Sequence, residues 1–143
     1  MEISWTDHDG NYLSGRIEAN VQPFVEALGL DDAADFFLNF GGSMIYVGKR
    51  GPNANNAVLR ILGEEVVRKL GDCFGDLGWM RIPLATKFMV RYLTSQGRSM
   101  REITRILRIT DVTARKYRRS DQYLRDATLN SKEYFERAKV DLA

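Results

Sequence analysis

The stretch SMREITRILRITDVTARKYRR, residues 99–119, determines the expected fold because it predicts two short helices joined by a tight turn. Ser99 and Glu102 have the spacing of a capping box, in which the serine hydroxyl accepts from the backbone N–H three residues on and the glutamate accepts from the serine N–H. The first helix therefore begins at Ser99. Thr110 is a favourable N-cap for the second helix. Together these signals predict a helix-turn-helix motif.

Apolar and polar side chains separate onto different faces of both predicted helices. Met100, Ile103 and Leu107 share one face of the first helix at spacings of three and four residues, and arginines occupy another face. In the second helix, Ala114 and Tyr117 are expected to face inward. The side chains left pointing outward are Val112, Thr113, Arg115, Lys116 and Arg119.

Charge is distributed unevenly along the chain. The 143 residues carry a formal net charge of +2, yet residues 81–119 contain eleven Lys or Arg against two acids, Glu102 and Asp111. Residues 1–80 are acidic, with six basic and twelve acidic side chains. A strongly basic segment is typical of a surface that neutralises phosphates, so double-stranded DNA is the expected partner. The alternative is an ordinary helical hairpin with a solvated basic face.

On the DNA interpretation, the outward residues of the second helix would enter a groove. Val112 offers a methyl contact that suits thymine, whereas Lys116 can donate to guanine. The candidates for positioning contacts with the DNA backbone are Arg98, Arg101 and Arg105.

The turn between the two helices breaks one local rule. It usually requires a residue that adopts positive φ easily, such as glycine, and this position falls on Arg108. We expect either a strained turn or a register that is shifted by one residue.

The composition excludes several classes of protein. Apolar residues make up 44% of the chain, which is enough for a core. No run of 18 apolar residues and no charged start followed by an apolar stretch occurs, so we expect no membrane span, no signal peptide and a cytoplasmic location. The single Cys73 and the single His8 predict neither a disulfide nor a zinc site, and Cys73 is expected to be buried. We expect no metal, no cofactor and no enzymatic activity.

The N-terminal residues 2–17 alternate loosely between apolar and polar side chains around an Asp9-Gly10 pair, which predicts a small hairpin. The acidic cluster around this turn lacks the glycine position and the closing glutamate of an EF-hand loop, so calcium binding is not expected. Pro23 suits the first turn of a helix capped by Asn20 and ending near Gly29.

An internal repeat with an offset of about 34 residues joins residues 28–49 to residues 62–84. Leucine, glycine, phenylalanine and glycine recur at matching positions, and acidic pairs follow the first glycine in both copies. Each copy predicts a helix that begins with acids, ends at an aromatic residue plus glycine, and leads into a short strand, Met44–Val47 or Trp79–Ile82. Coincidence between two amphipathic helices is the alternative. Strands this short must pair with each other, with the hairpin, or with a second copy of the chain.

The remaining segments complete the expected organisation. A turn-rich linker at residues 49–56 leads to a helix beginning near Ala54. A supporting helix from about Leu84 ends at Ser95 before a glycine, and Asn130 with Glu133 predicts a capping box that opens a final helix. The expected fold is mainly α with short β-strands. Its regions are a helix-strand dimerisation region over 1–83, a helix-turn-helix DNA-binding module over 84–120, and a helical tail over 121–143.

Several residues together resemble the Mor family of phage transcription activators, over roughly residues 28–119. The matching pieces are Phe40-Gly41-Gly42 leading into Ile45-Tyr46-Val47, Phe74-Gly75 leading into Ile82-Pro83, and REITRILRITDVTARKYRR. The resemblance implies a dimer in which strands of two subunits pair and the C-terminal module of each subunit enters DNA. It places in the dimer region either Ile45, Tyr46 and Val47 or their counterparts Met80, Arg81 and Ile82. The apolar edge of the first strand adds Met44 to the candidates for the interface.

The expected function is therefore that of a dimeric, sequence-specific transcription regulator of a phage or prophage, with RNA polymerase as a candidate further partner. A phage DNA-packaging protein similar to a small terminase subunit is the alternative, since such proteins also join a helix-turn-helix to an oligomerisation region. Assembly size separates the two, because a dimer suits a palindromic operator and a ring of many subunits suits packaging.

Overall fold

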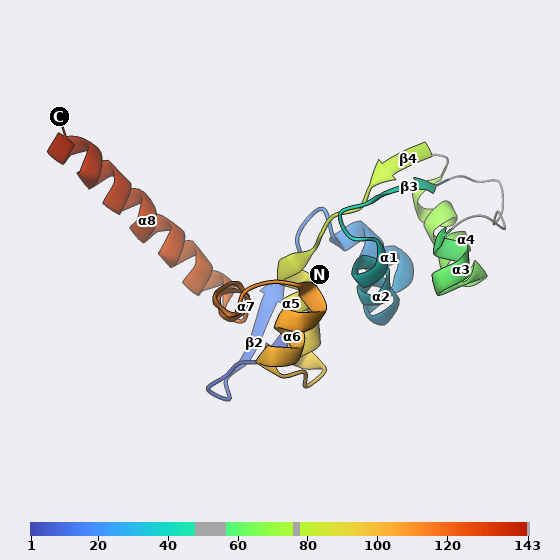
Figure 1. The fold of residues 1–143 in the computed structure, drawn as a ribbon, viewed down its shortest axis with the longest axis horizontal. Helices are drawn as coiled ribbons and strands as arrows, with labels where there is room; N and C mark the ends of the chain where they lie inside the picture. Colours follow the sequence, from blue (N-terminus) through green and yellow to red (C-terminus); the bar gives the residue numbers. More distant parts are fainter. Residues whose placement is uncertain (48–56, 76–77, 143) are drawn as a thin grey trace. The chain divides into compact units, whose positions relative to one another are not determined.

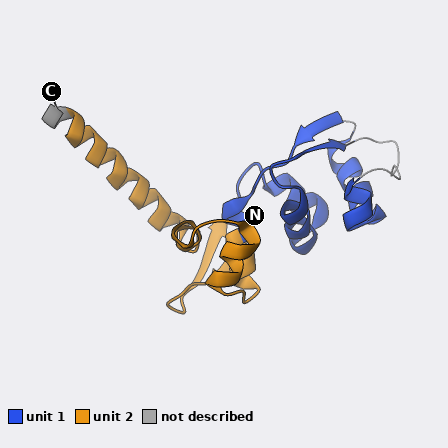
Figure 2. Cartoon of the chain, in the orientation of Figure 1, with its two compact units in different colours: residues 1, 17–89 blue, residues 2–16, 90–143 orange. Residues whose placement is uncertain are grey.

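The computed structural model describes residues 1–47, 57–75 and 78–142 (Figure 1). The described chain is mainly helical and contains two antiparallel two-stranded sheets, so the expected fold class is confirmed at this level. The chain divides into two compact units: unit 1 comprises residues 1 and 17–89, and unit 2 comprises residues 2–16 and 90–143 (Figure 2). The prediction divided the chain after residues 83 and 120 instead. The structure therefore groups the N-terminal hairpin with the basic segment.

Unit 1 contains the same series of elements twice. The first series is α1 (Gln22–Leu28), α2 (Leu30–Phe40) and β3 (Met44–Val47), and the second is α3 (Ala57–Leu62), α4 (Glu64–Phe74) and β4 (Gly78–Arg81). The glycines that precede α2 and α4 both have positive φ, 84° at Gly29 and 94° at Gly63, which places two helices in direct succession without a Cβ penalty. Both 11-residue helices end at phenylalanine followed by glycine, as the repeat predicts.

Three details of unit 1 differ from the sequence prediction. The N-cap of α1 is Val21 rather than Asn20, because the carbonyl of Glu18 already accepts from the first backbone N–H groups. β4 begins at Gly78, one residue before the predicted strand. Cys73 is exposed rather than buried, because it lies on the outer side of the amphipathic helix α4. The linker at 49–56 and the helix start expected near Ala54 lie outside the described residues.

The core of unit 1 is a cluster of phenylalanines. Phe24 of α1 packs against Phe36 and Phe37 of α2, with ring centroids 5.6 and 5.4 Å apart, and against Phe74 of α4 at 4.9 Å. Phe37 in turn contacts Phe88 at 5.8 Å. Fully burying an aromatic side chain contributes about 1.5–3 kcal/mol, so these rings dominate the stability of unit 1.

The strands β3 and β4 pair with each other, which selects one of the three pairings left open by the sequence. Met44 lies opposite Arg81 and Tyr46 opposite Trp79 in the antiparallel register. Successive side chains of a strand point to opposite faces, so Ile45 and Val47 are buried on the face opposite to Tyr46. The outer face carries Met44, Tyr46, Trp79 and Arg81, all exposed.

Unit 2 joins the hairpin of β1 (Glu2–Thr6) and β2 (Tyr12–Arg16) to four helical segments: the end of α5 (Thr86–Ser95), α6 (Met100–Leu107), α7 (Asp111–Tyr117) and α8 (Asp121–Leu142). The predicted hairpin is confirmed, with Ile3 opposite Gly15 and Trp5 opposite Leu13. Val90 and Leu93 of α5 form a small core with Ile103 and Ala114. This packing confirms that the end of α5 supports α6 and α7.

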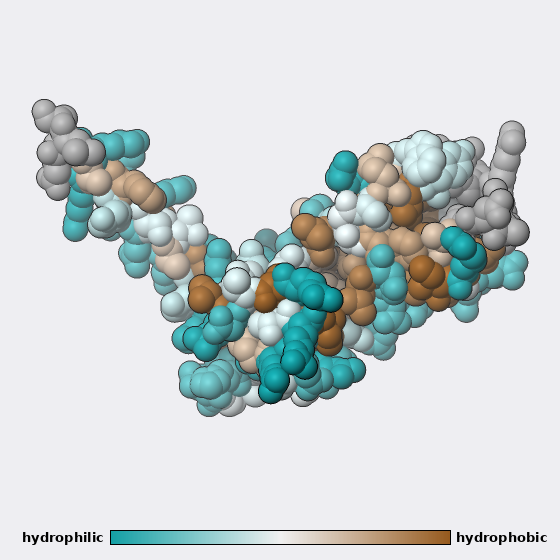
Figure 3. Space-filling view, in the orientation of Figure 1, coloured by the Kyte–Doolittle hydropathy of each residue, from teal (hydrophilic) through white to brown (hydrophobic). Residues whose placement is uncertain are grey.

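Two helix starts differ from the prediction. The final helix begins at Asp121 and runs through Asn130 without interruption for 22 residues, because Ser120 accepts from the backbone N–H of Tyr123 and caps it earlier. α5 begins at Thr86, so Leu84 and Ala85 lie outside it, with Leu84 exposed and Ala85 at φ 56°. Most of α8 is exposed, and Leu129, Tyr134 and Phe135 are among its exposed large side chains. Figure 3 shows hydrophobic patches at the surface of this helix.

Candidate nucleic-acid interface

The start of α6 is fixed by the predicted capping box. The hydroxyl of Ser99 accepts from the backbone N–H of Glu102 at 3.2 Å, and the Glu102 carboxylate accepts from the Ser99 N–H at 3.3 Å. The same carboxylate accepts from the Arg98 guanidinium at 3.0 Å. The Arg98 hydrogen bond, with further ones from Ser99, holds the pKa of Glu102 below its usual range.

The connection between α6 and α7 is three residues long, from Arg108 to Thr110. Arg108 ends α6 in the left-handed conformation, with φ 56° and ψ 44°. The predicted register is therefore correct, and the arginine itself adopts the positive φ. A left-handed conformation costs a residue other than glycine roughly 1–2 kcal/mol. The turn is accordingly a strained one, held by the packing on both sides.

α7 is capped by Thr110, whose hydroxyl accepts from the backbone N–H of Thr113 at 3.2 Å. Ala114 is fully buried beneath it, as predicted. Of the outward residues, Val112 is 70% exposed, and Arg115, Lys116 and Arg119 are exposed as well. Thr113 is only partly exposed, and its hydroxyl lies 3.1 Å from that of Thr110. Thr113 therefore supports the cap and offers less surface than its neighbours.

The basic residues differ in how freely they can meet a phosphate. Arg101 and Arg105 lie exposed on α6, and Figure 3 shows hydrophilic side chains covering this helix. Neither makes a salt bridge with a carboxylate of the described residues. Arg98 and Arg115 are exposed but already contact acids, Glu102 at 3.0 Å and Asp111 at 3.1 Å. Exposed pairs of this kind contribute little and can exchange for a phosphate.

Two cations counted in the basic segment do not belong to any exposed basic face. Lys87 of unit 1 contacts Glu18 at 3.8 Å and is partly buried. Arg91 is fully buried and forms a salt bridge with Asp121 at 2.8 Å. The charge count from the sequence therefore overstates the number of exposed cations, because it cannot distinguish a buried arginine from an exposed one.

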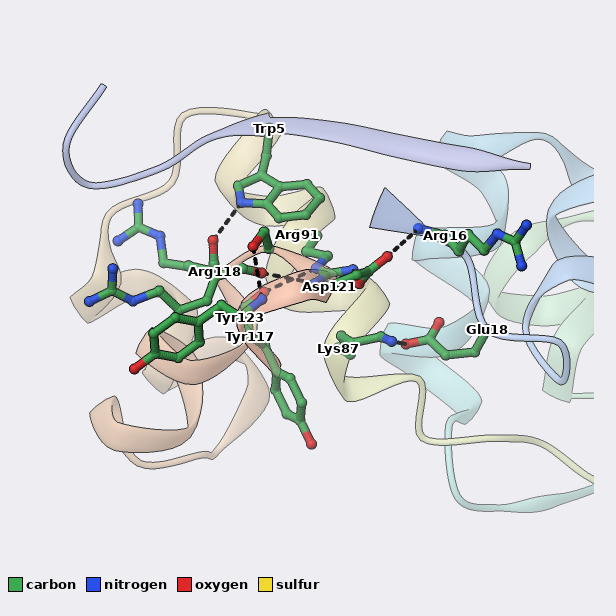
Figure 4. Close-up of polar contacts among 11 residues, drawn as sticks. Trp5, Arg16, Glu18, Lys87, Arg91, Tyr117, Arg118, Asp121 and Tyr123 are labelled. Carbon is green, nitrogen blue, oxygen red and sulfur yellow. Dashed lines mark hydrogen bonds and ion pairs between the residues drawn. The ribbon is translucent and has the colours of Figure 1, made fainter. Parts of the chain in front are cut away.

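Arg91 has a structural role at the end of α7 (Figure 4). Its guanidinium donates to the carbonyl of Tyr117 at 3.1 Å and to the carbonyl of Arg119 at 2.9 Å. The indole N–H of Trp5 donates to the intervening carbonyl of Arg118 at 2.8 Å. The last carbonyls of a helix lack partners within it, so Arg91 and Trp5 together cap the C-terminus of α7. A cation at this end also interacts favourably with the helix dipole.

The same arginine connects the hairpin to the start of α8. Its guanidinium stacks over the ring of Trp5 at 4.3 Å, and its partner Asp121 also accepts from the backbone N–H of Arg16 at 2.9 Å. Gly15 lies beside it, where an added Cβ would come within 2.4 Å of the guanidinium. Sequence reasoning missed this cluster of Trp5, Gly15, Arg91 and Asp121. The only local signal is a lone arginine within the apolar face of a predicted helix.

The residues expected at a dimer interface fall into two groups. Met44 and Tyr46 are exposed, with 48% and 54% of their surfaces accessible. Ile45, Val47 and Ile82 are buried in the core of unit 1, and Met80 is partly buried. Of the residues expected at the interface, Met44, Tyr46 and Arg81 offer exposed side chains to a second subunit, and Trp79 lies on the same face.

No known protein family, curated protein or solved structure matches the chain. Among the described residues no helix combines the length and apolar character needed to cross a membrane. In the same part of the chain, no three His, Cys, Asp or Glu side chains gather as metal ligands.

Proposed function

We propose that this protein is a dimeric, sequence-specific DNA-binding transcription regulator of the Mor type, with α6 and α7 as its helix-turn-helix. The observation that carries the proposal is the outward face of α7. It presents Val112, Arg115 and Lys116 on a helix whose two ends are both capped and whose inner face is buried. α7 would be the recognition helix, and Arg101 and Arg105 of α6 would contact the flanking phosphates.

The individual side chains suit different parts of a DNA site. Lys116 is a donor without a carboxylate partner in the described part of the chain, so it can reach guanine O6 and N7. Val112 is apolar and highly exposed, which suits the methyl group of thymine. Arg115 and Arg119 flank this pair and suit the phosphates of the adjacent strand. RNA polymerase remains a candidate second partner of a regulator of this type.

Selection from a randomised DNA library tests the proposal directly. The wild-type chain is expected to return one consensus with two half-sites, and Lys116→Ala is expected to lose preference at one base pair of each half-site. Losing a good base contact costs about 1–3 kcal/mol. Lys132→Ala, an exposed cation on α8, is the matched control and should return the wild-type consensus. Recovery of no consensus by the wild-type chain would refute sequence-specific binding.

The phosphate contacts have their own signature. Arg105→Ala is expected to weaken binding to all sequences alike and to reduce the slope of log K against log salt by about 0.9. An unchanged salt slope would remove Arg105 from the interface.

The dimer is proposed to form through the outer face of the β3–β4 sheet. Tyr46 and Trp79 make an edge-to-face pair with ring centroids 5.7 Å apart, and both rings are exposed. Exposed apolar side chains on a two-stranded sheet are typical of an interface. Tyr46→Asp is therefore expected to yield folded monomers in sedimentation, whereas Ile45→Asp should unfold unit 1 because Ile45 is buried. A wild-type monomer at micromolar concentration would contradict the dimer, and a large ring would favour the packaging alternative.

A further inference from the structure

A cavity of about 400 Å³ lies in unit 2 beside the C-terminal end of α7. One side of this cavity is the turn of the hairpin, with Asp7, His8 and Asp9. The other side is formed by Met100 of α6 and by three arginines at and after α7, Arg115, Arg118 and Arg119. The sequence prediction assigned no binding role to His8, Asp9 or Arg118. We call this cavity the arginine pocket.

The acids of the hairpin turn do not satisfy the three guanidinium groups. Asp7 is committed to the turn, because its carboxylate accepts from the backbone N–H groups of Asp9 at 3.0 Å and Asn11 at 2.8 Å. These bonds, the one from the Asn11 backbone first, together with the nearby charge of Arg119 hold the pKa of Asp7 below its usual range, so the group stays ionised. Of the two acids that line the cavity, only Asp9 has a carboxylate that is not engaged in the turn and can face the arginines.

The arginines retain unused donors. The Nε–H of Arg118 is buried and has no acceptor among the described residues. Arg119 lies over the ring of Tyr123, with its Cζ 5.0 Å from the ring centroid, and makes no salt bridge with a carboxylate of the described residues. A guanidinium carries five N–H donors in a planar fork that matches the oxygens of a phosphate. Arg115 already pairs with Asp111 at 3.1 Å, so Arg118 and Arg119 supply the donors that the pocket offers to a ligand.

We propose that the arginine pocket binds one phosphate of the DNA backbone, at the edge of the groove that α7 enters. The inference rests on the proposed function and names a contact of that function. It favours a DNA phosphate over a free anion, because Arg115 belongs both to the pocket and to the outward face of α7, and Arg119 of the pocket is exposed just after this helix. A duplex on that face carries its flanking phosphates past the pocket. His8 adds a donor, and the carboxylate of Asp9 opposes the bound phosphate.

The hairpin is thereby part of the DNA-binding surface. Its turn is stiffened by the Asp7 hydrogen bonds and by Gly10, whose φ is 83°. The opposing carboxylate of Asp9 lowers the affinity for DNA, so its removal strengthens binding.

The test uses the duplex returned by the library selection, with single methylphosphonate linkages placed in turn along the site. A methylphosphonate is uncharged, so at the contacted position it should weaken wild-type binding by at least about tenfold, because it removes a hydrogen bond to a charged group. Arg118→Ala should lose a similar factor on the native duplex and nothing more on the modified one. Arg125→Ala, an exposed arginine of α8, is the control and should remain sensitive to the modification.

A second variant keeps the test valid if Arg118→Ala does not fold. Asp9→Asn should tighten binding severalfold, whereas Glu2→Gln, which removes an exposed charge from the far end of the same hairpin, should leave it unchanged. Titration with inorganic phosphate, followed through the C2 proton of the only histidine, distinguishes a free-anion site from a DNA contact. The DNA contact would be overturned if inorganic phosphate shifted the His8 resonance while Arg118→Ala and the methylphosphonate weakened DNA binding independently of each other.

The outcomes separate the two proposals. Specific DNA binding with additive effects at every methylphosphonate position refutes the pocket and leaves the proposed function intact. A wild-type chain that binds no duplex refutes both.

Discussion

Replacing Gly15 by alanine should destabilise unit 2 strongly, although the substitution adds one methyl group to a strand. The φ of Gly15 does not lie in the left-handed region, so alanine meets no backbone strain there. Its Cβ would instead come within 2.4 Å of Nη1 of Arg91, and within 3.1 Å of both Cζ of Arg91 and Cη2 of Trp5. No real Cβ tolerates the first distance. Either the guanidinium or the strand must therefore move.

The magnitude follows from the contacts that the guanidinium would lose. Arg91 is fully buried, donates to two carbonyls and pairs with Asp121 at 2.8 Å. Breaking a buried ion pair costs about 3–5 kcal/mol, because the charge stays buried without its partner. We expect Gly15→Ala to cost this amount. A domain the size of unit 2 shifts its Tm by about 4–8 °C per kcal/mol, so the fall should exceed about 10 °C.

Tryptophan fluorescence measures this effect specifically. Trp5 is buried with 1% of its surface exposed, whereas Trp79 of unit 1 is 69% exposed. In a Trp79→Phe background, urea unfolding of unit 2 is read from Trp5 alone. Ser14→Ala is the control in the same strand, because it removes only an exposed hydroxyl contact with Ser4, and it should cost less than about 1 kcal/mol.

A double-mutant cycle with Arg91→Lys decides whether the clash is the cause. Lysine lacks the guanidinium that the added Cβ would strike, so Gly15→Ala should cost much less in that background. Equal costs in both backgrounds, or a loss below about 1 kcal/mol in the wild-type chain, would refute the reasoning.

Three further predictions follow from the caps and the core. Arg108→Gly should raise the free energy of unfolding by about 0.5–1 kcal/mol by relieving the left-handed arginine, whereas Arg105→Gly inside α6 should lower it by a similar amount; denaturant titration of the pair checks the opposite signs. The lowered pKa of Glu102 gives stability that is present above the ordinary glutamate pKa and lost as the pH falls through the folded-state value. The stability difference between the wild type and Glu102→Gln should therefore shrink on acidification, and a constant difference would argue against the Arg98 contact. Phe36→Ala should destabilise unit 1 by about 3–5 kcal/mol in calorimetry, while Leu38→Ala on the exposed side of the same helix should have little effect.

The local structure around α6 and α7 could be predicted because its signals lie within a few residues of each other. The capping box of Ser99, the N-cap of Thr110 and the positive φ at Arg108 each depend on side chains and backbone of the same turn. The repeat in unit 1 was visible for the same reason, since glycine and phenylalanine mark the ends of both helices. Signals formed by residues a few positions apart can be recognised in the sequence without knowing the tertiary contacts.

The final helix shows where local signals compete. Asn130 and Glu133 have capping-box spacing, but Ser120 already caps the helix ten residues earlier. Asn130 therefore lies inside a continuous helix, where a residue cannot be an N-cap.

The cluster around Arg91 could not be predicted, because its members are far apart in the sequence. Trp5 and Arg118 are 113 residues apart, and Arg16 and Asp121 are 105 apart. Alternation over residues 2–17 indicates a hairpin and says nothing of what its apolar face covers. Arg91 also differs from its expected role. The charge count included it among the basic residues of a surface, whereas its buried guanidinium donates to carbonyls at the end of a helix.

The length of α7 explains why the hairpin matters to any contact made by its outward face. A seven-residue helix is far too short to be stable alone, because helix nucleation is costly and few hydrogen bonds follow it. Its N-terminus is capped by a neighbour in sequence, but its C-terminal carbonyls depend on Arg91 and on Trp5 of β1. The outward face of α7 is therefore fixed by residues 2–16 as much as by residues 99–119. A fragment restricted to the two short helices lacks the groups that hold Val112, Arg115 and Lys116 in place, so the hairpin belongs to the smallest part of the chain that can present them.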